Sequence, residues 1–154
     1  MSAHTKASCG EVIPEELLFV ALLKAADTVS QGAEQLAKTG GLTMAQYNVL
    51  RILRGAGPEG LPCSAIGERM ISRDPDMTRL LDRMEKRQLI TRERQTLDRR
   101  VVLTCITAEG LKLLKKLDGP IREFHKKQFA HISPSKIKAL SEMLVELSPP
   151  EEAP

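Results

Sequence analysis

The sequence predicts a mainly α-helical fold with one small β-hairpin. Apolar residues recur at the spacing of amphipathic helices along most of residues 14–147. Near residues 99–106 the pattern changes to a run rich in β-branched residues, which favours a strand. Clusters of glycine and proline separate the segments and are typical of helix ends and turns. A chain of 154 residues is long enough to bury a core as one domain.

The first two helices are predicted on residues 14–38 and from Thr43 onward. Pro14 stands at the first helical position and two glutamates follow it, as is typical of a helix start. Gly40 and Gly41 interrupt the pattern, and Thr43 is expected to cap the next helix. The residues of this second helix expected to face the core are Tyr47, Leu50 and Leu53.

Residues 61–86 predict two short helices that follow a loop on residues 55–60. The first covers residues 63–70. Asp74 as cap and Pro75 at the first position mark the start of the second. In this second helix one apolar stripe is formed by Met77, Leu80, Leu81 and Met84, and the opposite face carries Arg79, Arg83 and Lys86. Two short helices joined by a tight turn, the second with a basic outer face, indicate a helix-turn-helix.

A β-hairpin and two further helices complete the prediction. Residues 89–106 read as two strands with a polar, arginine-rich tip, and a hairpin directly after a helix-turn-helix is a wing. Thr107 is expected to cap a long helix, which Gly119-Pro120 should kink or interrupt. The last helix begins at Ser133-Pro134. Residues 1–12 and 148–154 are expected to be flexible.

The charge distribution supports a nucleic-acid partner. Residues 62–106 hold ten Lys and Arg against seven Asp and Glu, and the net charge of the chain is +3. The excess therefore lies in the middle third, where nine of the ten bases are arginines. The planar guanidinium of arginine can donate two hydrogen bonds at once to a phosphate or to the edge of a base.

These motifs together resemble the MarR-type winged helix-turn-helix transcriptional regulators. Residues 78–85 (TRLLDRME) are similar to the recognition helix of that family, and the wing strand starts at residues 89–90. Residues 98–100 (DRR) resemble the wing signature, and residues 107–110 (TAEG) resemble the opening of the following helix. The match extends from residue 42 to residue 110 with consistent order and spacing.

The resemblance implies a single domain in two parts. Residues 42–106 would form the winged helix-turn-helix lobe, and residues 13–40 and 107–147 a helical dimerisation region. The leucine-rich terminal helices agree with an extensive interface between subunits. A homodimer would bind a pseudo-palindromic operator in double-stranded DNA, as a repressor. A small anionic or phenolic effector, bound in a crevice lined by the first helix, Tyr47 and the start of the helix at residues 107–130, would regulate it.

Ten residues are predicted to serve DNA binding: Ser64, Arg73, Asp76, Thr78, Arg79, Arg83, Arg94, Asp98, Arg99 and Arg100. By the resemblance, Asp98 would hold Arg100 in the minor groove. Arg79 and Arg83 would contact phosphates or the major groove, or alternatively bridge Asp82 or Glu85 on a solvated face. The hydroxyl of Ser64 has two equal interpretations, a phosphate contact or a helix cap. Arg92 and Arg94 are interpreted as phosphate neighbours or surface charges.

Other functions have less support. The sequence shows no catalytic, metal-binding or cofactor motif, so we expect neither an enzyme nor a cofactor. No apolar run is long enough to span a bilayer and no secretory signal begins the chain, so a cytoplasmic protein is expected. Three cysteines are expected to be free thiols, although Cys63 at a helix start leaves open a regulator that senses thiol oxidation. A winged helix that binds proteins instead of DNA is the remaining alternative.

Overall fold

The computed structural model describes residues 12–72, 74–94 and 101–147, and it confirms a mainly helical fold with a small β-sheet. The elements in chain order are α1 (Pro14–Thr39), α2 (Met44–Ala56), the short 3-10 helix η1 (Gly57–Glu59), β1 (Leu61–Pro62), α3 (Cys63–Arg69), α4 (Met77–Lys86), β2 (Ile90–Arg94), β3 (Val102–Ile106), α5 (Ala108–Gln128) and α6 (Pro134–Glu146).

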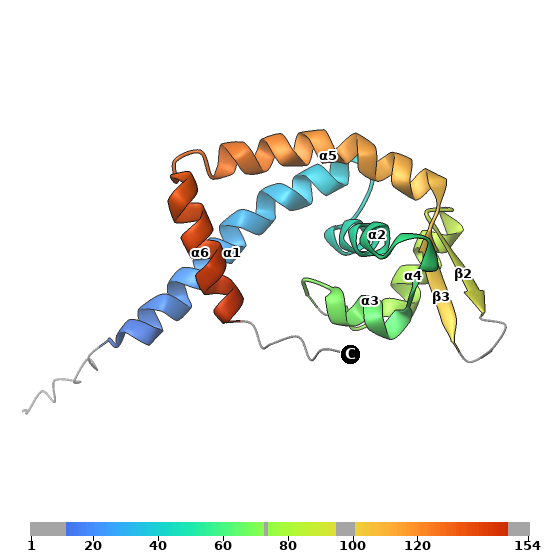
Figure 1. Cartoon of the computed structure of the whole chain (residues 1–154), viewed down its shortest axis with the longest axis horizontal. Coiled ribbons are helices and arrows are strands. Elements are labelled where there is room, and N and C mark those ends of the chain that lie inside the picture. The colour runs from blue at the N-terminus through green and yellow to red at the C-terminus, as the bar shows by residue number, and fades with distance from the viewer. Residues whose placement is uncertain (1–11, 73, 95–100, 148–154) are drawn as a thin grey trace, which may run out of the picture.

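The chain has two parts that lie side by side (Figure 1). The long helices α1 and α5 pack against each other, and α6 turns away from the end of α5. Helices α2, α3 and α4 and the strands form a lobe at the other end of α5. Helix α2 is central to this lobe because it contacts α1, α3, α4, α5 and β3.

The core lies around α2, as the apolar spacing predicts. Tyr47, Leu50 and Leu53 are all buried, which confirms their expected orientation. Side chains from α3, α4 and β2 close over them, among them Ile66, Leu80, Leu81, Met84 and Ile90. The lobe therefore has its own core, against which α4 buries one face.

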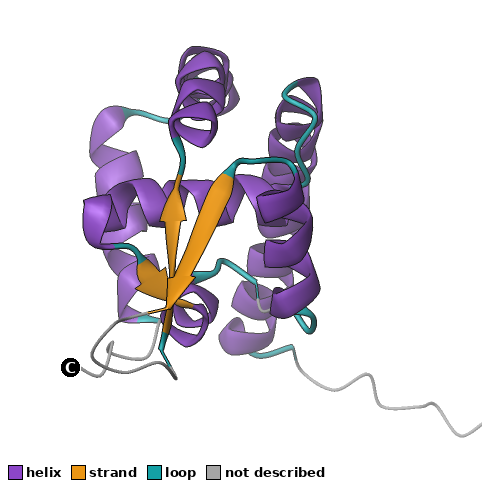
Figure 2. Cartoon of the chain, turned by 90° about the vertical axis from the view of Figure 1, so that its right-hand side faces the viewer, coloured by secondary structure: helices purple, strands orange, loops and turns teal. Residues whose placement is uncertain are grey.

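The sheet is a three-stranded antiparallel sheet in the order β1-β3-β2 (Figure 2). In the β2–β3 hairpin Ile90 pairs with Ile106 and Arg94 with Val102. The additional strand β1, where Leu61 pairs with Thr104, was not predicted from the sequence. It has only two residues, one of them proline, so it carries no periodic signal. The tip of the hairpin, residues 95–100, lies outside the described residues.

Three expectations about helix ends are wrong. Helix α4 begins at Met77, not at Pro75, because Asp76 is its cap and accepts the backbone N–H of Arg79. Asp74 instead accepts the N–H of Asp76 at 2.8 Å, which makes residues 74–76 a local turn. Helix α2 extends to Ala56, into the predicted loop.

Helix α5 continues through Pro120 without interruption. Proline removes one backbone donor, yet buried side chains anchor the helix on both sides of it, so the predicted interruption is wrong. The anchoring side chains are Leu114, Leu117 and Ile121, which are all at most 8 % exposed. Tertiary packing therefore overrides the local helix-breaking signal.

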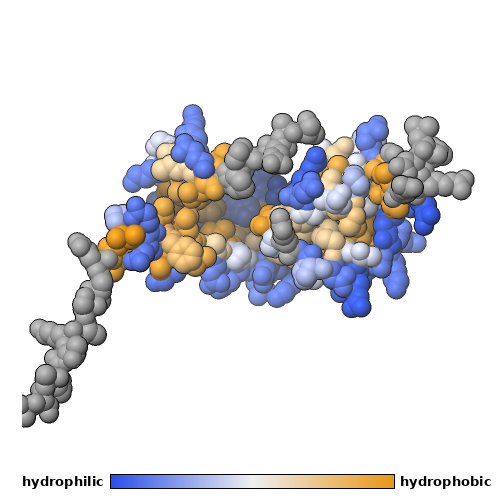
Figure 3. Space-filling view, turned by 90° about the horizontal axis from the view of Figure 1, so that it is seen from below, coloured by the Kyte–Doolittle hydropathy of each residue, from blue (hydrophilic) through white to orange (hydrophobic). Residues whose placement is uncertain are grey.

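Much apolar surface remains exposed on α1 and α6. No residue of α6 is buried, and its apolar side chains include Ile137, Leu140, Met143 and Leu144. Leu17, Leu18, Phe19 and Leu23 on α1 are also exposed. Figure 3 shows apolar surface gathered at this end of the molecule. Within the described part of the chain, no helix is both long and apolar enough to cross a membrane.

Candidate nucleic-acid interface

A partly buried hydrogen bond ties the turn between α3 and α4 to helix α2. The side chain of Asn48 on α2 is 8 % exposed, and its Oδ1 accepts the backbone N–H of Ile71 at 2.8 Å. This bond ties the turn to the centre of the lobe. Because a buried amide must be hydrogen-bonded, the contact also determines where the turn can lie. Sequence reasoning did not identify Asn48, which stands between apolar residues and has no motif around it.

Helix α4 buries one face and presents the other to solvent. Leu80, Leu81 and Met84 are each at most 1 % exposed. The opposite face exposes the side chains of Thr78, Arg79, Arg83 and Lys86. This confirms the predicted basic outer face on the second helix of the pair.

The cap of α4 also pairs with its first arginine. Asp76 Oδ1 accepts the N–H of Arg79 at 3.2 Å, and Asp76 Oδ2 lies 3.2 Å from Arg79 Nε. The Arg79 side chain is nevertheless 81 % exposed. An exposed pair of this kind is weak, so the guanidinium can exchange this partner for another anion.

Arg92 is not the free surface charge that the sequence suggested. Its Nε donates to Glu85 at 2.9 Å, and one terminal nitrogen donates to both Glu85 and Asp82 at 2.6 Å. Its side chain is 25 % exposed, and the pKa of Arg92 is raised, chiefly by the hydrogen bond to Glu85. The two acids of α4 are therefore held by β2, and the predicted alternative in which they bridge Arg79 or Arg83 is wrong.

The remaining predicted residues fall into two groups. Ser64 and Arg94 are exposed, on the first turn of α3 and at the end of β2. Pro62 precedes α3 and no side chain caps this helix, so the capping interpretation of Ser64 is wrong. The predicted contacts outside the described residues are Arg73, Asp98, Arg99 and Arg100.

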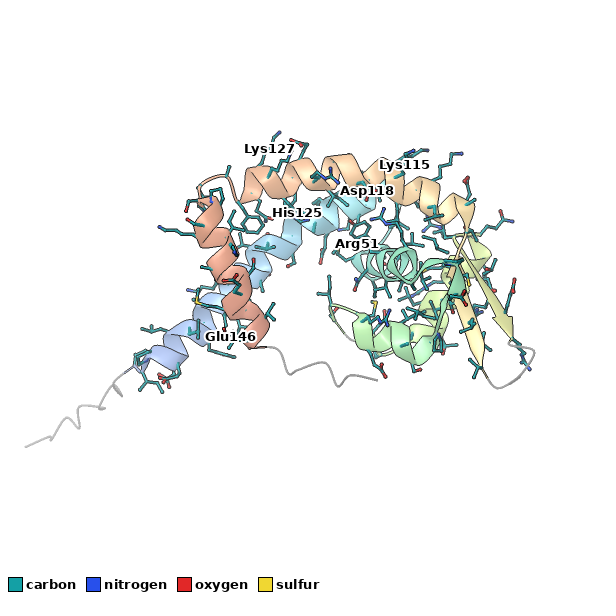
Figure 4. All side chains as sticks on the ribbon, in the orientation of Figure 1. Arg51, Lys115, Asp118, His125, Lys127 and Glu146 are labelled. Atoms are coloured by element: carbon teal, nitrogen blue, oxygen red, sulfur yellow. The ribbon has the colours of Figure 1, made fainter. Side chains whose placement is uncertain are left out.

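A second feature is an open cavity of about 380 Å³ between α2 and α5. It is lined by Tyr47, Arg51, Arg54, Asp118, Ile121, Arg122, His125 and Lys126. Tyr47 was expected here, but α5 contributes its second half and not its start, and α1 contributes none of these side chains. Figure 4 shows Arg51, Asp118 and His125 on the two helices that border it.

The charges in this cavity are mostly positive. Arg54 donates to both oxygens of Asp118, at 3.0 and 2.8 Å, and so joins the lobe to the long helix. Arg51 lies 5.9 Å from the centre of the Tyr47 ring, within the range of a cation–π contact. Since Asp118 is the single carboxylate among these lining residues, the cavity favours an anion.

Cys63 and Cys105 are free thiols, as predicted, and both are half-buried. The third cysteine, Cys9, lies outside the described residues. Cys105 Sγ lies 3.7 Å from the carbonyl oxygen of Pro58, consistent with a packing role beside β1. Oxidation sensing by Cys63 stays a prediction.

Comparison with known proteins gives consistent matches. The MarR family profile matches residues 42–102. A MarR transcription factor from Planctomyces limnophilus is 36% identical, with a TM-score of 0.67, over 90% of this chain and 98% of that one. The homoprotocatechuate degradative operon repressor of Escherichia coli is 27% identical over 84% of this chain and 86% of its own. NadR in complex with 4-hydroxyphenylacetate shares the fold, with a TM-score of 0.72 at 22% identity over 98% of this chain and 100% of that chain.

Proposed function

The chain belongs to the MarR family of transcriptional regulators, and from this membership we propose that it is a homodimeric repressor of a pseudo-palindromic operator. The observation that carries the proposal is the α4 helix. Its leucines are buried in the lobe, and its exposed face presents Arg79, Arg83 and Lys86. A helix with one buried apolar face and one exposed basic face has the shape and charge to enter a major groove.

We assign each of the ten predicted residues a role in DNA binding. Thr78, Arg79 and Arg83 on α4 contact base edges or phosphates in the major groove. Asp76 caps the helix and would accept a hydrogen bond from a cytosine amino group. The flanking backbone and minor-groove contacts come from Ser64, Arg73, Arg94, Asp98, Arg99 and Arg100, with Asp98 holding Arg100.

The exposed apolar side chains of α1 and α6 support the proposed homodimer. Leu140 and Leu144 lie one turn apart on α6 and are 44% and 40% exposed. A monomer would leave this surface in contact with water, which is unfavourable. A second copy of the chain, related by a two-fold axis, would cover it and place two α4 helices on successive major grooves, about 34 Å apart.

Fluorescence anisotropy with labelled DNA from upstream of the chain's own gene, titrated over a salt series, tests DNA binding. Wild type is expected to bind with an affinity that falls steeply with salt. Arg83→Ala and Arg100→Ala should each weaken binding by about 1–3 kcal/mol, that is roughly 5- to 150-fold. Lys115→Ala is the matched control, because it removes one exposed positive charge from the outer side of α5 (Figure 4).

Equal affinities for all four proteins would contradict the assigned contacts. Absence of salt-dependent binding to this DNA and to DNA selected from a random library would favour the protein-binding alternative over a repressor.

The cavity between α2 and α5 supports regulation by a small anion. Solved relatives include NadR with 4-hydroxyphenylacetate and PcaV with its natural ligand. In this chain the Tyr47 ring and the Arg51 guanidinium would receive an aromatic carboxylate. Its carboxylate would compete with Asp118 for Arg54, and so loosen the ion pair between the lobe and α5. The lobe would then shift relative to α1, α5 and α6, the helices of the proposed dimer interface. This shift would change the spacing of the two α4 helices.

Isothermal titration with a panel of aromatic carboxylates, beginning with 4-hydroxyphenylacetate, tests this effector site. The uncharged amide of each acid is the matched control. We expect the acids to bind wild type and to weaken its DNA affinity, with both effects reduced in Arg51→Ala. Equal binding of the acids and their amides would contradict anion recognition. If none of the aromatic carboxylates binds wild type, the proposed effector site would be contradicted.

A further inference from the structure

Two carboxylates on α4 stand beside the face that is proposed to meet DNA. Asp82 is one turn from Arg79 and one turn from Lys86, so it lies on the same exposed side of the helix. Glu85 follows one turn after Asp82 on the same flank. Both side chains remain partly exposed, at 44% and 38%. Left unpaired, they would offset two of the three exposed bases of α4 and repel phosphates.

Arg92 holds both of these carboxylates through one guanidinium. Three hydrogen bonds of 2.6 to 2.9 Å connect it to Asp82 and Glu85. A planar guanidinium has several N–H donors in fixed directions, so it can hydrogen-bond to two carboxylates at once. A lysine ammonium is a compact charge whose hydrogen bonds are less directional. The pKa of Arg92 is raised, with the hydrogen bond to Glu85 as its largest cause.

The same side chain joins the wing to α4. Arg92 is on β2 and pairs with Thr104 on β3, and Thr104 is 1 % exposed. The backbone at Arg92 is therefore fixed in the sheet, and its side chain reaches α4. No other ion pair within the described residues connects α4 to the wing strands.

We propose that Arg92 is a positioning residue for operator recognition. It acts through Asp82 and Glu85, not by a DNA contact of its own. It keeps their charge away from the phosphates, and it fixes the base of the wing on α4, so that wing and helix meet adjacent grooves in one geometry. The inference rests on the proposed DNA-binding function and adds a determinant of its selectivity.

The test compares binding to an operator selected by wild type from a random DNA library with binding to random-sequence DNA. Three variants separate charge from geometry: Arg92→Gln, Arg92→Lys, and the triple variant Asp82→Asn/Glu85→Gln/Arg92→Gln. Thermal unfolding of each variant is measured alongside, and Lys115→Gln is the control for loss of one exposed charge. The triple variant has no unpaired carboxylate, so it stays informative even if Arg92→Gln folds poorly.

Arg92→Gln is expected to bind the operator at least about 10-fold more weakly, because two phosphate-repelling carboxylates are released. Arg92→Lys should recover part of this loss. The triple variant is one unit more positive than wild type at this cluster, so it should bind random DNA at least as well as wild type does. Its ratio of operator to random affinity should nevertheless stay reduced, whereas a purely electrostatic role for Arg92 would leave that ratio unchanged.

Wild-type selectivity in Arg92→Gln and in the triple variant would overturn the inference while the proposed function stands. Failure of the wild type to select any sequence would overturn the proposed function, and this inference with it.

Discussion

Truncation of the two central leucines of α6 is expected to dissociate the proposed dimer. Burying a whole leucine side chain stabilises by about 1.5–3 kcal/mol. Leu140 and Leu144 are 44% and 40% exposed in the single chain, so covering the rest of each contributes roughly two-fifths of that amount, ~0.6–1.2 kcal/mol. A two-fold axis repeats both residues. Leu140→Ala/Leu144→Ala should therefore weaken the dimer by roughly 2–5 kcal/mol, on the order of 10²- to 10³-fold in its dissociation constant.

Sedimentation velocity over a dilution series measures this change. Lys138→Ala/Glu142→Ala is the matched control, because it also removes two side chains from α6, keeps the net charge and breaks only an exposed ion pair at 3.9 Å. Alanine keeps the helical propensity in both variants, so loss of helix does not explain a difference. An unchanged dissociation constant in the leucine variant, or a wild type that is monomeric at tens of micromolar, would contradict a dimer interface on α6.

Two further predictions concern the junction between the wing and α5. An added Cβ at Gly110 would overlap the carbonyl oxygen of Leu89, so Gly110→Ala should destabilise by roughly 1–3 kcal/mol and lower the Tm by about 3–10 °C. Gly55→Ala on α2 meets nothing within 4 Å and should leave the Tm unchanged or higher; equal shifts for the two variants would contradict the packing argument. Thr107 Oγ1 accepts the N–H of Gly110 at 3.0 Å and donates to the carbonyl of Gln88 at 2.7 Å, so Thr107→Ala should cost about 1–2 kcal/mol in urea unfolding. Thr107→Ser keeps both bonds, and a loss as large as that of Thr107→Ala would contradict this account of the cap.

The parts of the fold that follow from local chemistry were predicted from the sequence. The apolar stripe of α4 and the threonine caps at Thr43 and Thr107 depend on residues within one or two turns, and the structure confirms them. The start of α4 was predicted two residues early because Asp74 and Asp76 are both good caps. Only the turn that Asp74 makes with the N–H of Asp76 decides between them.

Features that depend on distant partners were not predicted. Strand β1 exists because Leu61 meets Thr104, a residue more than forty positions away in the sequence. Arg92 was interpreted as a surface charge because its partners lie on another element, and only the packing of β2 on α4 brings them within 3 Å. The cavity beside Arg51 needs the second half of α5 above α2, which no local pattern specifies.

The central claim is that two copies of α4 read a two-fold symmetric operator. Selection of bound sequences from a random double-stranded DNA library by the wild-type protein, followed by sequencing, tests this claim directly. We expect enrichment of a pseudo-palindrome whose half-site centres lie about 10–10.5 base pairs apart. Enrichment of a single half-site without two-fold symmetry, or no enrichment above the starting library, would contradict it.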